Sequence, residues 1–178
     1  MNDQPPLRYD PIARGLHWVM ALLVLGMVGL GFYAANLNPN DPFSQRAFFW
    51  HRSFGMLVLL LAIIRIAWRY HHPSPPAPDY LPVWEKRDAL RIQLALYALM
   101  IVIPITGYLI STADGNGVNF FGLFEIPALL DVDKGRATTL SPVHFGTALV
   151  FISLAALHIM AALKHHYLDR DGLLSRMW

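Results

Sequence analysis

Long apolar runs alternate with short polar segments along the chain, and the lengths of these runs indicate where they lie. A helix needs about 20 mostly apolar residues to cross a hydrocarbon layer about 30 Å thick. Four runs reach that length, at about 12–37, 46–70, 89–112 and 141–167. A proline-rich connector, RYHHPSPPAPDYLP, separates the second run from the third, because its prolines cannot continue a helix. The pattern predicts four membrane-spanning helices.

A single domain accounts for the whole chain. The sequence has no internal repeat and no low-complexity region, so we predict one all-α membrane domain over residues 1–178, built as a bundle of four transmembrane helices. The longest connection, residues 113–140, contains the aromatic segment NFFGLFEIPALL. We expect this segment to lie along the membrane interface rather than to span the membrane.

Composition supports an integral membrane protein and excludes several kinds of site. The chain is 55% hydrophobic and 15% charged, whereas about a quarter of the residues of a soluble domain are charged. It has no cysteine, which removes disulfides, thiolate metal sites, iron–sulfur clusters and covalently attached c-type haem. The net charge is +2 and no interleaved basic and aromatic surface is evident, so we expect lipid and no nucleic acid as a partner.

The distribution of basic residues predicts the orientation of the bundle. Four spans place both termini on one side together with the second connection, and these segments hold ten Lys and Arg against four in the other two connections. The larger number marks the cytoplasmic side. We therefore expect both termini in the cytoplasm. The ten are Arg8, Arg14, Arg65, Arg69, Lys86, Arg87, Arg91, Lys164, Arg170 and Arg176, and the four are Arg46, Arg52, Lys134 and Arg136.

Four histidines interrupt the apolar runs at matching depths. His144 and His158 lie fourteen residues apart in the fourth span, which is close to four helical turns, so both project from one face about 21 Å apart. His17 opens the first span at its cytoplasmic end, at the level of His158. His51 begins the second span at the opposite end, at the level of His144. The topology predicts two cross-helix pairs, His17 with His158 and His51 with His144.

Paired neutral imidazoles on opposed helices suit haem iron, which takes one axial ligand on each face of the ring. Zinc usually has three or four protein ligands, whereas each level here supplies two, with no carboxylate inside the spans. Hydrogen bonding between helices is the alternative for any single histidine, but ionisable groups at such depths are costly and usually functional. We predict two bis-histidine b haems, and the absence of an open iron position favours electron transfer.

Glycines and arginines near these histidines fit the same interpretation. Gly55 lies one turn after His51, where a missing side chain lets a macrocycle approach the backbone; ordinary helix packing is the alternative. Arg65 and Arg14 lie at the depth of the inner pair and are candidates to neutralise haem propionates, and Arg52 is the outer candidate. Snorkelling of these side chains to lipid headgroups is the alternative. Further glycines in the first and fourth spans are Gly26, Gly29, Gly31 and Gly146.

The remaining histidines lie beyond the spans, beside prolines or charges, and are expected to be solvated at the interface. These histidines are His71, His72, His165 and His166.

Over nearly its whole length the chain resembles the bacterial dihaem cytochrome b561 membrane proteins. The resemblance rests on the order and spacing of several segments: RGLHWVMALLVL, HRSFG at the start of the second helix, RIAWRYHHPSPPAP, IPITGYLIS, NFFGLFEIP and LHIMAALKHHYLDRDGLLSRM. It implies a bundle in the bacterial inner membrane with two b haems, held by His17 with His158 and by His51 with His144. It also implies electron exchange with quinone and, as in one type of the family, oxidation of periplasmic superoxide. For protonation of the reduced quinone, the four histidines beyond the spans are candidates at an inner site, and Glu125 or Asp114 at an outer site.

Three functions are compatible with these features. The leading one is a transmembrane electron conduit between superoxide, or a periplasmic electron-transfer protein, and the quinone pool. The second is a haem-b anchor subunit that delivers electrons between a peripheral dehydrogenase or hydrogenase and quinone. The third is a small transporter or metal-handling protein, against which stands the absence of an intramembrane Asp or Glu.

Overall fold

The computed structural model describes residues 8–38 and 41–178, and within them it contains four long helices. These are α1 (Pro11–Ala35), α2 (Pro42–His71), α3 (Val83–Ala113) and α4 (Lys134–Lys164). All four are long and apolar enough to cross a membrane. The predicted all-α bundle of four spans is therefore confirmed. Shorter elements are the strands β1 (Val118–Phe120) and β2 (Phe124–Ile126), the π-helix His165–Asp169 and the 3-10 helix Leu174–Met177.

Two helices, α2 and α4, begin after capping aspartates, several positions before the apolar runs from which they were predicted. Asp41 caps α2 by accepting from the backbone N–H of Phe43, with Pro42 as the first helical residue. Asp133 caps α4 by accepting from the backbone N–H of Arg136, and the helix begins at Lys134, seven residues before the predicted start at 141. The polar first turn of each helix lies outside the hydrophobic run, so hydropathy alone places the start too late.

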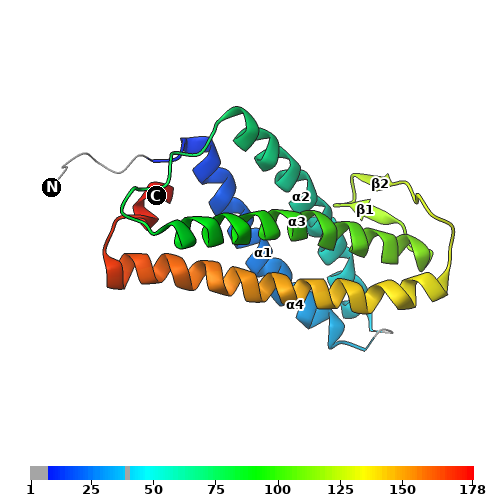
Figure 1. Ribbon diagram of the computed structural model, residues 1–178. Helices are drawn as coiled ribbons and strands as arrows, with labels where there is room; N and C mark the ends of the chain where they lie inside the picture. The colour runs from blue at the N-terminus through cyan, green and yellow to red at the C-terminus, as the bar shows by residue number, and fades with distance from the viewer. Residues whose placement is uncertain (1–7, 39–40) are drawn as a thin grey trace.

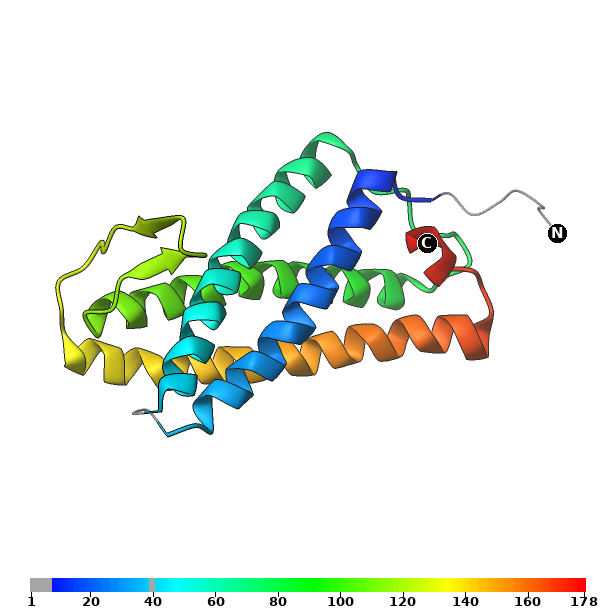
Figure 2. The same cartoon turned by 180° about the vertical axis from the view of Figure 1, so that it is seen from behind.

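The bundle consists of two antiparallel pairs that cross at a steep angle. Figures 1 and 2 show α1 beside α2, and this pair lies across the pair formed by α3 and α4. The closest backbone packing joins α3 with α4, α1 with α2, and α2 with α3. The helix α4 thus packs closely against α3, whereas its histidines face α1 and α2 across wider gaps. A small core of Met20, Ala62, Met100 and Phe151 sits where the two pairs cross.

The first described residues and the C-terminal segment lie together at one end of the bundle. The backbone N–H of Tyr9 donates to the carbonyl of Arg176 at 3.1 Å, and the hydroxyl of Tyr80 in the second connection donates to the carbonyl of Asp171 at 3.2 Å. We call this the terminal end. The opposite end carries the two strands and is called the hairpin end (Figure 1).

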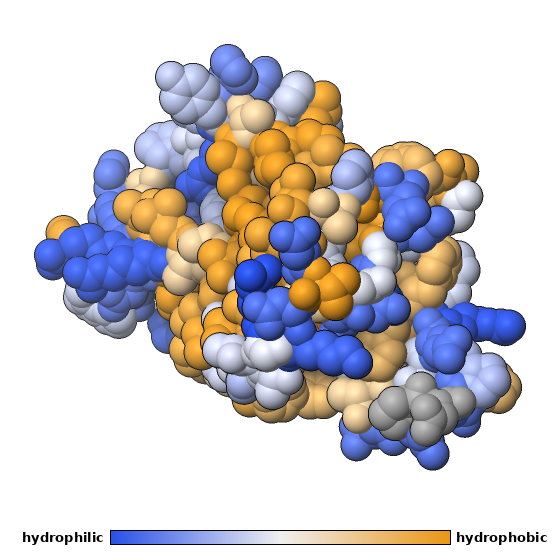
Figure 3. Space-filling view, turned by 90° about the vertical axis from the view of Figure 1, so that its right-hand side faces the viewer, coloured by the Kyte–Doolittle hydropathy of each residue, from blue (hydrophilic) through white to orange (hydrophobic). Residues whose placement is uncertain are grey.

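Apolar side chains cover the outside of the helices. Leu22 is 70% exposed, Leu25 61% and Ile63 52%. Figure 3, which views the hairpin end, shows a broad hydrophobic band with hydrophilic residues to either side. Exposed apolar surface on this scale is unfavourable in water and suits contact with lipid.

The aromatic segment of the third connection forms a β-hairpin, which the sequence did not predict. β1 pairs antiparallel with β2, with Asn119 opposite Glu125. The buried hydroxyl of Ser53 on α2 donates to the carbonyl of Asn119 at 2.8 Å and accepts from the N–H of Phe121 at 3.3 Å. Strands of three residues are too short to show an alternating pattern. Contacts from α2 therefore fix the position of the hairpin.

Candidate haem sites

The structure brings the four intramembrane histidines together in two pairs of nearly identical geometry. At the hairpin end, the ring centroids of His51 on α2 and His144 on α4 lie 6.3 Å apart with an interplanar angle of 76°. At the terminal end, the centroids of His17 on α1 and His158 on α4 also lie 6.3 Å apart, at 77°. Each pair bridges a gap between helices that do not pack closely against each other.

This spacing fits one metal ion held between two imidazoles. A metal midway between centroids 6.3 Å apart would lie about 3.2 Å from each. That distance is roughly the sum of a metal–nitrogen bond of about 2 Å and the distance of about 1.2 Å from a ring nitrogen to the ring centre. The donor set therefore fits an iron porphyrin with two axial histidines.

The outer nitrogen of His144 has two partners on α3. Its Nδ1 lies 3.0 Å from the carbonyl oxygen of Ile103 and 3.1 Å from the hydroxyl of Thr106. A carbonyl can only accept, so Nδ1 carries the proton and Nε2 keeps the lone pair that a metal needs. Thr106 could not be recognised as a site residue from the sequence, because its role depends on how α3 crosses α4.

His51 has a different environment. Its Nδ1 is buried and has no hydrogen-bond partner among the described residues. Instead the ring edge lies against Gly31, where an added Cβ would come within 3.0 Å of Cε1. His144 lies in the same way against Gly107, at 3.1 Å. These two glycines let α1 and α3 support the histidines closely, and Gly107 was not singled out by the sequence.

The other glycines divide into two groups. Gly55 lines the cavity beside His51, and an added Cβ there would meet the terminal methyl of Met27 at 3.6 Å. Gly26, Gly29 and Gly146 are exposed, and an added Cβ would meet nothing within 4 Å. Among the glycines near the histidines, Gly31, Gly55 and Gly107 are therefore the ones that shape the site.

A cavity of about 950 Å³ surrounds the pair at the hairpin end and reaches all four helices. It is lined by His51, His144 and many apolar side chains, together with the charged groups Arg52 and Asp114. The volume lies at the upper end of the range for ligand pockets, and the mixture of apolar walls with a few polar groups is typical of cofactor sites. Arg52 donates from Nη1 to the hydroxyl of Ser111 at 3.0 Å and from Nε to the carbonyl of Phe48 at 3.2 Å.

At the terminal end, Arg65 contacts the predicted ligand directly. Its Nη2 lies 3.0 Å from Nδ1 of His17, and its guanidinium lies over the ring of Tyr97 at 5.4 Å. The guanidinium of Arg69 lies over the same ring at 5.8 Å. Two cations thus flank one aromatic ring next to the histidine pair.

Arg14 is placed differently from Arg65. Its guanidinium donates to the carbonyl of Trp178, and the neighbouring Trp18 donates from its indole N–H to the carbonyl of Met177 at 2.8 Å. The end of the chain therefore lies on the first turns of α1 and binds Arg14.

The four histidines beyond the spans are not equally solvated. His71, His72 and His166 are exposed, as expected. The side chain of His165 is only 12% exposed, because its Nδ1 lies 2.7 Å from a carboxylate oxygen of Asp171 and 3.2 Å from one of Asp169. The expectation of a solvated side chain is wrong for His165. The cause is a turn of π-helix after α4, which folds both aspartates back onto the ring.

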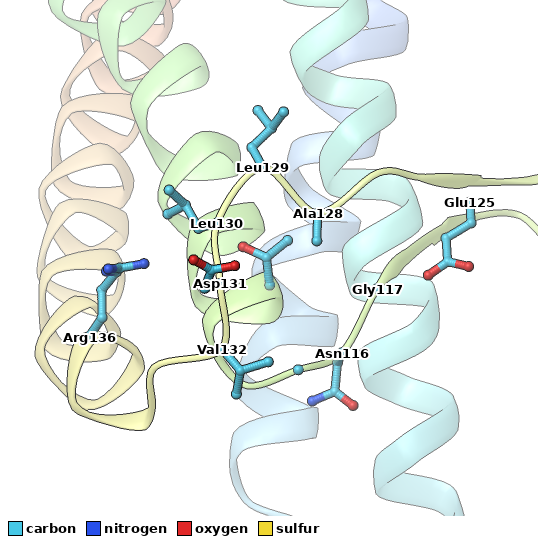
Figure 4. Close-up of a pocket in the computed structure, with 11 residues that line it drawn as sticks. Asn116, Gly117, Glu125, Ala128, Leu129, Leu130, Asp131, Val132 and Arg136 are labelled. Carbon is cyan, nitrogen blue, oxygen red and sulfur yellow. The ribbon is translucent and has the colours of Figure 1, made fainter.

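A second hollow of about 520 Å³ lies between the hairpin and the start of α4. Figure 4 shows Arg136 directed toward Asp131, while Glu125 lies on the hairpin beside Gly117. Asn116 lines both this hollow and the cavity at the histidines. Glu125 therefore lies on the outer hollow, whereas Asp114 lines the histidine cavity itself.

Four membrane-spanning helices with two facing histidine pairs, one of them inside a large apolar cavity, define a membrane protein of the b-cytochrome class. The chain belongs to the prokaryotic cytochrome b561 family, whose model matches residues 8–178. As a member of this family, the protein is a membrane protein that binds haem b and takes part in electron transfer.

Three relatives span almost the full length of the chain. Cytochrome b561 homolog 2 of Escherichia coli (strain K12) is 40% identical over 174 residues, 97% of this chain and 92% of the relative. A probable superoxide oxidase CybB of Yersinia pestis is 29% identical over 178 residues, 96% and 95% of the two chains. Cytochrome b561 homolog 1 of E. coli K12 is 24% identical over 174 residues, 96% of each chain.

Proposed function

We propose that this protein carries single electrons across the membrane through two b haems. His17 and His158 would hold one, and His51 and His144 the other. The observation that carries the proposal is the matched spacing of 6.3 Å between ring centroids in both pairs. When bound, a haem supplies a one-electron iron couple, and two histidine ligands leave no open position for oxygen chemistry.

The surrounding residues have distinct roles in this proposal. Ile103 and Thr106 hold the ring of His144 with Nε2 directed into the site. Gly31, Gly55 and Gly107 leave room for a macrocycle and its ligands. Arg52 lines the cavity and is available to a propionate on the outer side.

Arg65 would change its partner when the inner haem binds. A guanidinium can only donate, so its contact with Nδ1 of His17 places the imidazole proton on Nε2. A histidine that ligates iron through Nε2 carries its proton on Nδ1. Arg65 therefore has to turn away from His17, and a haem propionate is the new partner that matches its charge. Arg14, already bound to the carbonyl of Trp178, is the weaker candidate for this role.

We place the protein in the bacterial inner membrane as one domain over residues 1–178, with both termini cytoplasmic. The excess of basic residues at the terminal end, ten against four, supports this orientation. The pair His51 and His144 then serves the periplasmic side, and the pair His17 and His158 the cytoplasmic side.

Quinone is the electron acceptor in this proposal, and superoxide is the donor that the relative from Y. pestis suggests. Two superoxide anions would each lose one electron to give O2, and one quinone would take both electrons and two protons to give quinol. The outer connections hold four basic residues against Asp41, Asp114, Glu125, Asp131 and Asp133. Their net charge does not attract an anion, so a periplasmic electron-transfer protein is the alternative donor.

A second function, that of an anchor subunit for a peripheral dehydrogenase or hydrogenase, is favoured by the surface of the third connection. Leu123 is 76% exposed, Phe124 57% and Leu129 77% at the hairpin end. Such side chains provide the apolar contact that a partner subunit requires.

Haem quantification tests the proposal most directly. A pyridine haemochrome assay of the purified protein should give about two haems b per chain. His51→Ala and His144→Ala should each remove the outer haem, while His17→Ala and His158→Ala should each remove the inner one. The exposed His166 is the control, and His166→Ala should keep both. A haem-free protein, or loss of both haems from every single variant, would overturn the assignment.

Reconstitution separates the two functions. In liposomes that contain only this protein and a quinone, superoxide generated outside should reduce the quinone if the protein is a superoxide oxidase. Retention of both haems without this reaction would favour the anchor subunit.

A further inference from the structure

The two histidine pairs have the same spacing between ring centroids but different electrostatic surroundings. At the hairpin end, Nδ1 of His144 faces the carbonyl of Ile103 at 3.0 Å. A ligand histidine that donates to a carbonyl gains negative character on its other nitrogen and gives more electron density to a metal. This effect favours the oxidised state of a metal bound by His144.

The terminal end presents cations instead. Nδ1 of His17 lies 3.0 Å from Nη2 of Arg65, and the guanidinium of Arg69 lies 5.8 Å from the centroid of the Tyr97 ring that Arg65 also contacts. Among residues 8–38 and 41–178, no carboxylate forms an ion pair with either arginine. Their positive charge is little screened, because both the ligand pair and Arg65 lie partly buried between helices.

At the hairpin end the corresponding cation shares its cavity with a carboxylate. Arg52 and Asp114 both line this cavity. Each haem would bring the same two propionates, so these do not cancel the difference. Besides the propionates, the terminal end thus has two arginines without a carboxylate ion-pair partner among the described residues. The hairpin end has one arginine with a carboxylate in the same cavity, and a histidine that donates to a carbonyl.

We propose that this asymmetry sets the direction of electron transfer: Arg65, with Arg69, raises the reduction potential of the inner haem, while Asp114 and the carbonyl of Ile103 keep that of the outer haem lower. A positive charge near a metal stabilises the reduced state, and a negative charge stabilises the oxidised state. Single electrons then move favourably from the outer haem to the inner haem. The inference rests on the function proposed above, since it presupposes two haems.

Two substitutions test the inference because they change the two haems in opposite directions. Arg65→Gln removes the inner cation and should lower the inner potential. Asp114→Asn removes the outer anion and should raise the outer potential. Each should change the ratio of oxidised to reduced haem at a fixed ambient potential by about tenfold, which is about 59 mV for a one-electron couple. Arg65→Lys keeps the charge and should stay close to the unmodified protein.

Optical redox titration of the full-length protein provides the measurement. The inner potential is read in a His144→Ala background, where only the inner haem is expected, and the outer potential in a His17→Ala background. Asp79→Asn, in the exposed second connection, is the control and should change neither potential. An inner potential equal to or below the outer one, or potentials that do not respond to either substitution, would overturn the inference. Absence of haem from the unmodified protein would instead overturn the proposed function.

Discussion

Replacing Gly107 with alanine tests how the proposed outer haem site is built. An alanine Cβ at this position would lie 3.1 Å from Cε1 of His144. Carbon atoms in contact prefer about 3.5–4.0 Å, so His144 would have to move by roughly 0.4 Å or more. Its Nδ1 is held by Ile103 and Thr106, so the ring cannot move without weakening those contacts.

The expected cost follows from the packing. Overpacking a well-fitted site by a methyl group costs about 1–3 kcal/mol, which corresponds to roughly 5- to 150-fold weaker haem binding at about 1.4 kcal/mol per tenfold change. Alanine favours a helix by up to about 1 kcal/mol over glycine, so the helix itself is not expected to unfold. Gly107→Ala should therefore lose outer haem while the inner haem and the helical content are kept.

Haem titration of the haem-free protein, followed by reduced-minus-oxidised spectra, measures this effect. The control is Gly29→Ala, because Gly29 is exposed and an added Cβ there meets nothing within 4 Å. If Gly107→Ala binds both haems with unchanged affinity and spectra, Gly107 does not position His144 as described. Equal losses in both variants would point to a general effect on the bundle.

Two further predictions concern the rest of the fold. Tyr108→Phe removes a buried hydroxyl that donates to the carbonyl of Pro127 and accepts from the N–H of Leu129 at 3.0 Å. The loss should destabilise the third connection by about 1–3 kcal/mol. Proteolysis between residues 113 and 133 should then be faster, while the membrane spans stay intact. Burial alone would raise the pKa of Asp10, but hydrogen bonds from the backbone N–H of Ala13 and the indole of Trp68 dominate and lower it. The Asp10 carboxylate then stabilises the fold at pH values above its unfolded pKa, and this contribution disappears as the pH falls through the lowered value. Asp10→Asn keeps a helix cap, so its thermal stability should depend less on pH below about 4 than that of the unmodified protein, and an identical acid profile would contradict this.

The spans and the levels of the histidines could be predicted because both depend on local properties. Hydropathy marks a membrane helix, and the helical period places His144 and His158 on one face. Helix starts such as Lys134 could not be found in this way, since they depend on a capping aspartate outside the apolar run.

The contacts between helices could not be predicted from the sequence alone. Nothing in the chain distinguishes Gly107, which supports a histidine, from Gly29, which faces outward. The partnership of Thr106 with His144 depends on the crossing of α3 and α4. The hairpin likewise depends on Ser53, which lies more than sixty residues away along the chain.

The two proposed haem ligands of α4 lie on the same helix, and this arrangement has an electrical consequence. His144 and His158 are fourteen residues apart, about 21 Å at 1.5 Å per residue, which is about two thirds of a hydrocarbon layer about 30 Å thick. In the proposed orientation, an electron moving between the two levels travels toward the negative side of an energised membrane. Moving a full charge across costs about 2.3 kcal/mol per 100 mV, so this step would be opposed by roughly 1.6 kcal/mol per 100 mV. The membrane voltage would thus oppose electron transfer through this protein, and the size of this effect depends on the distance along α4 between the two histidines.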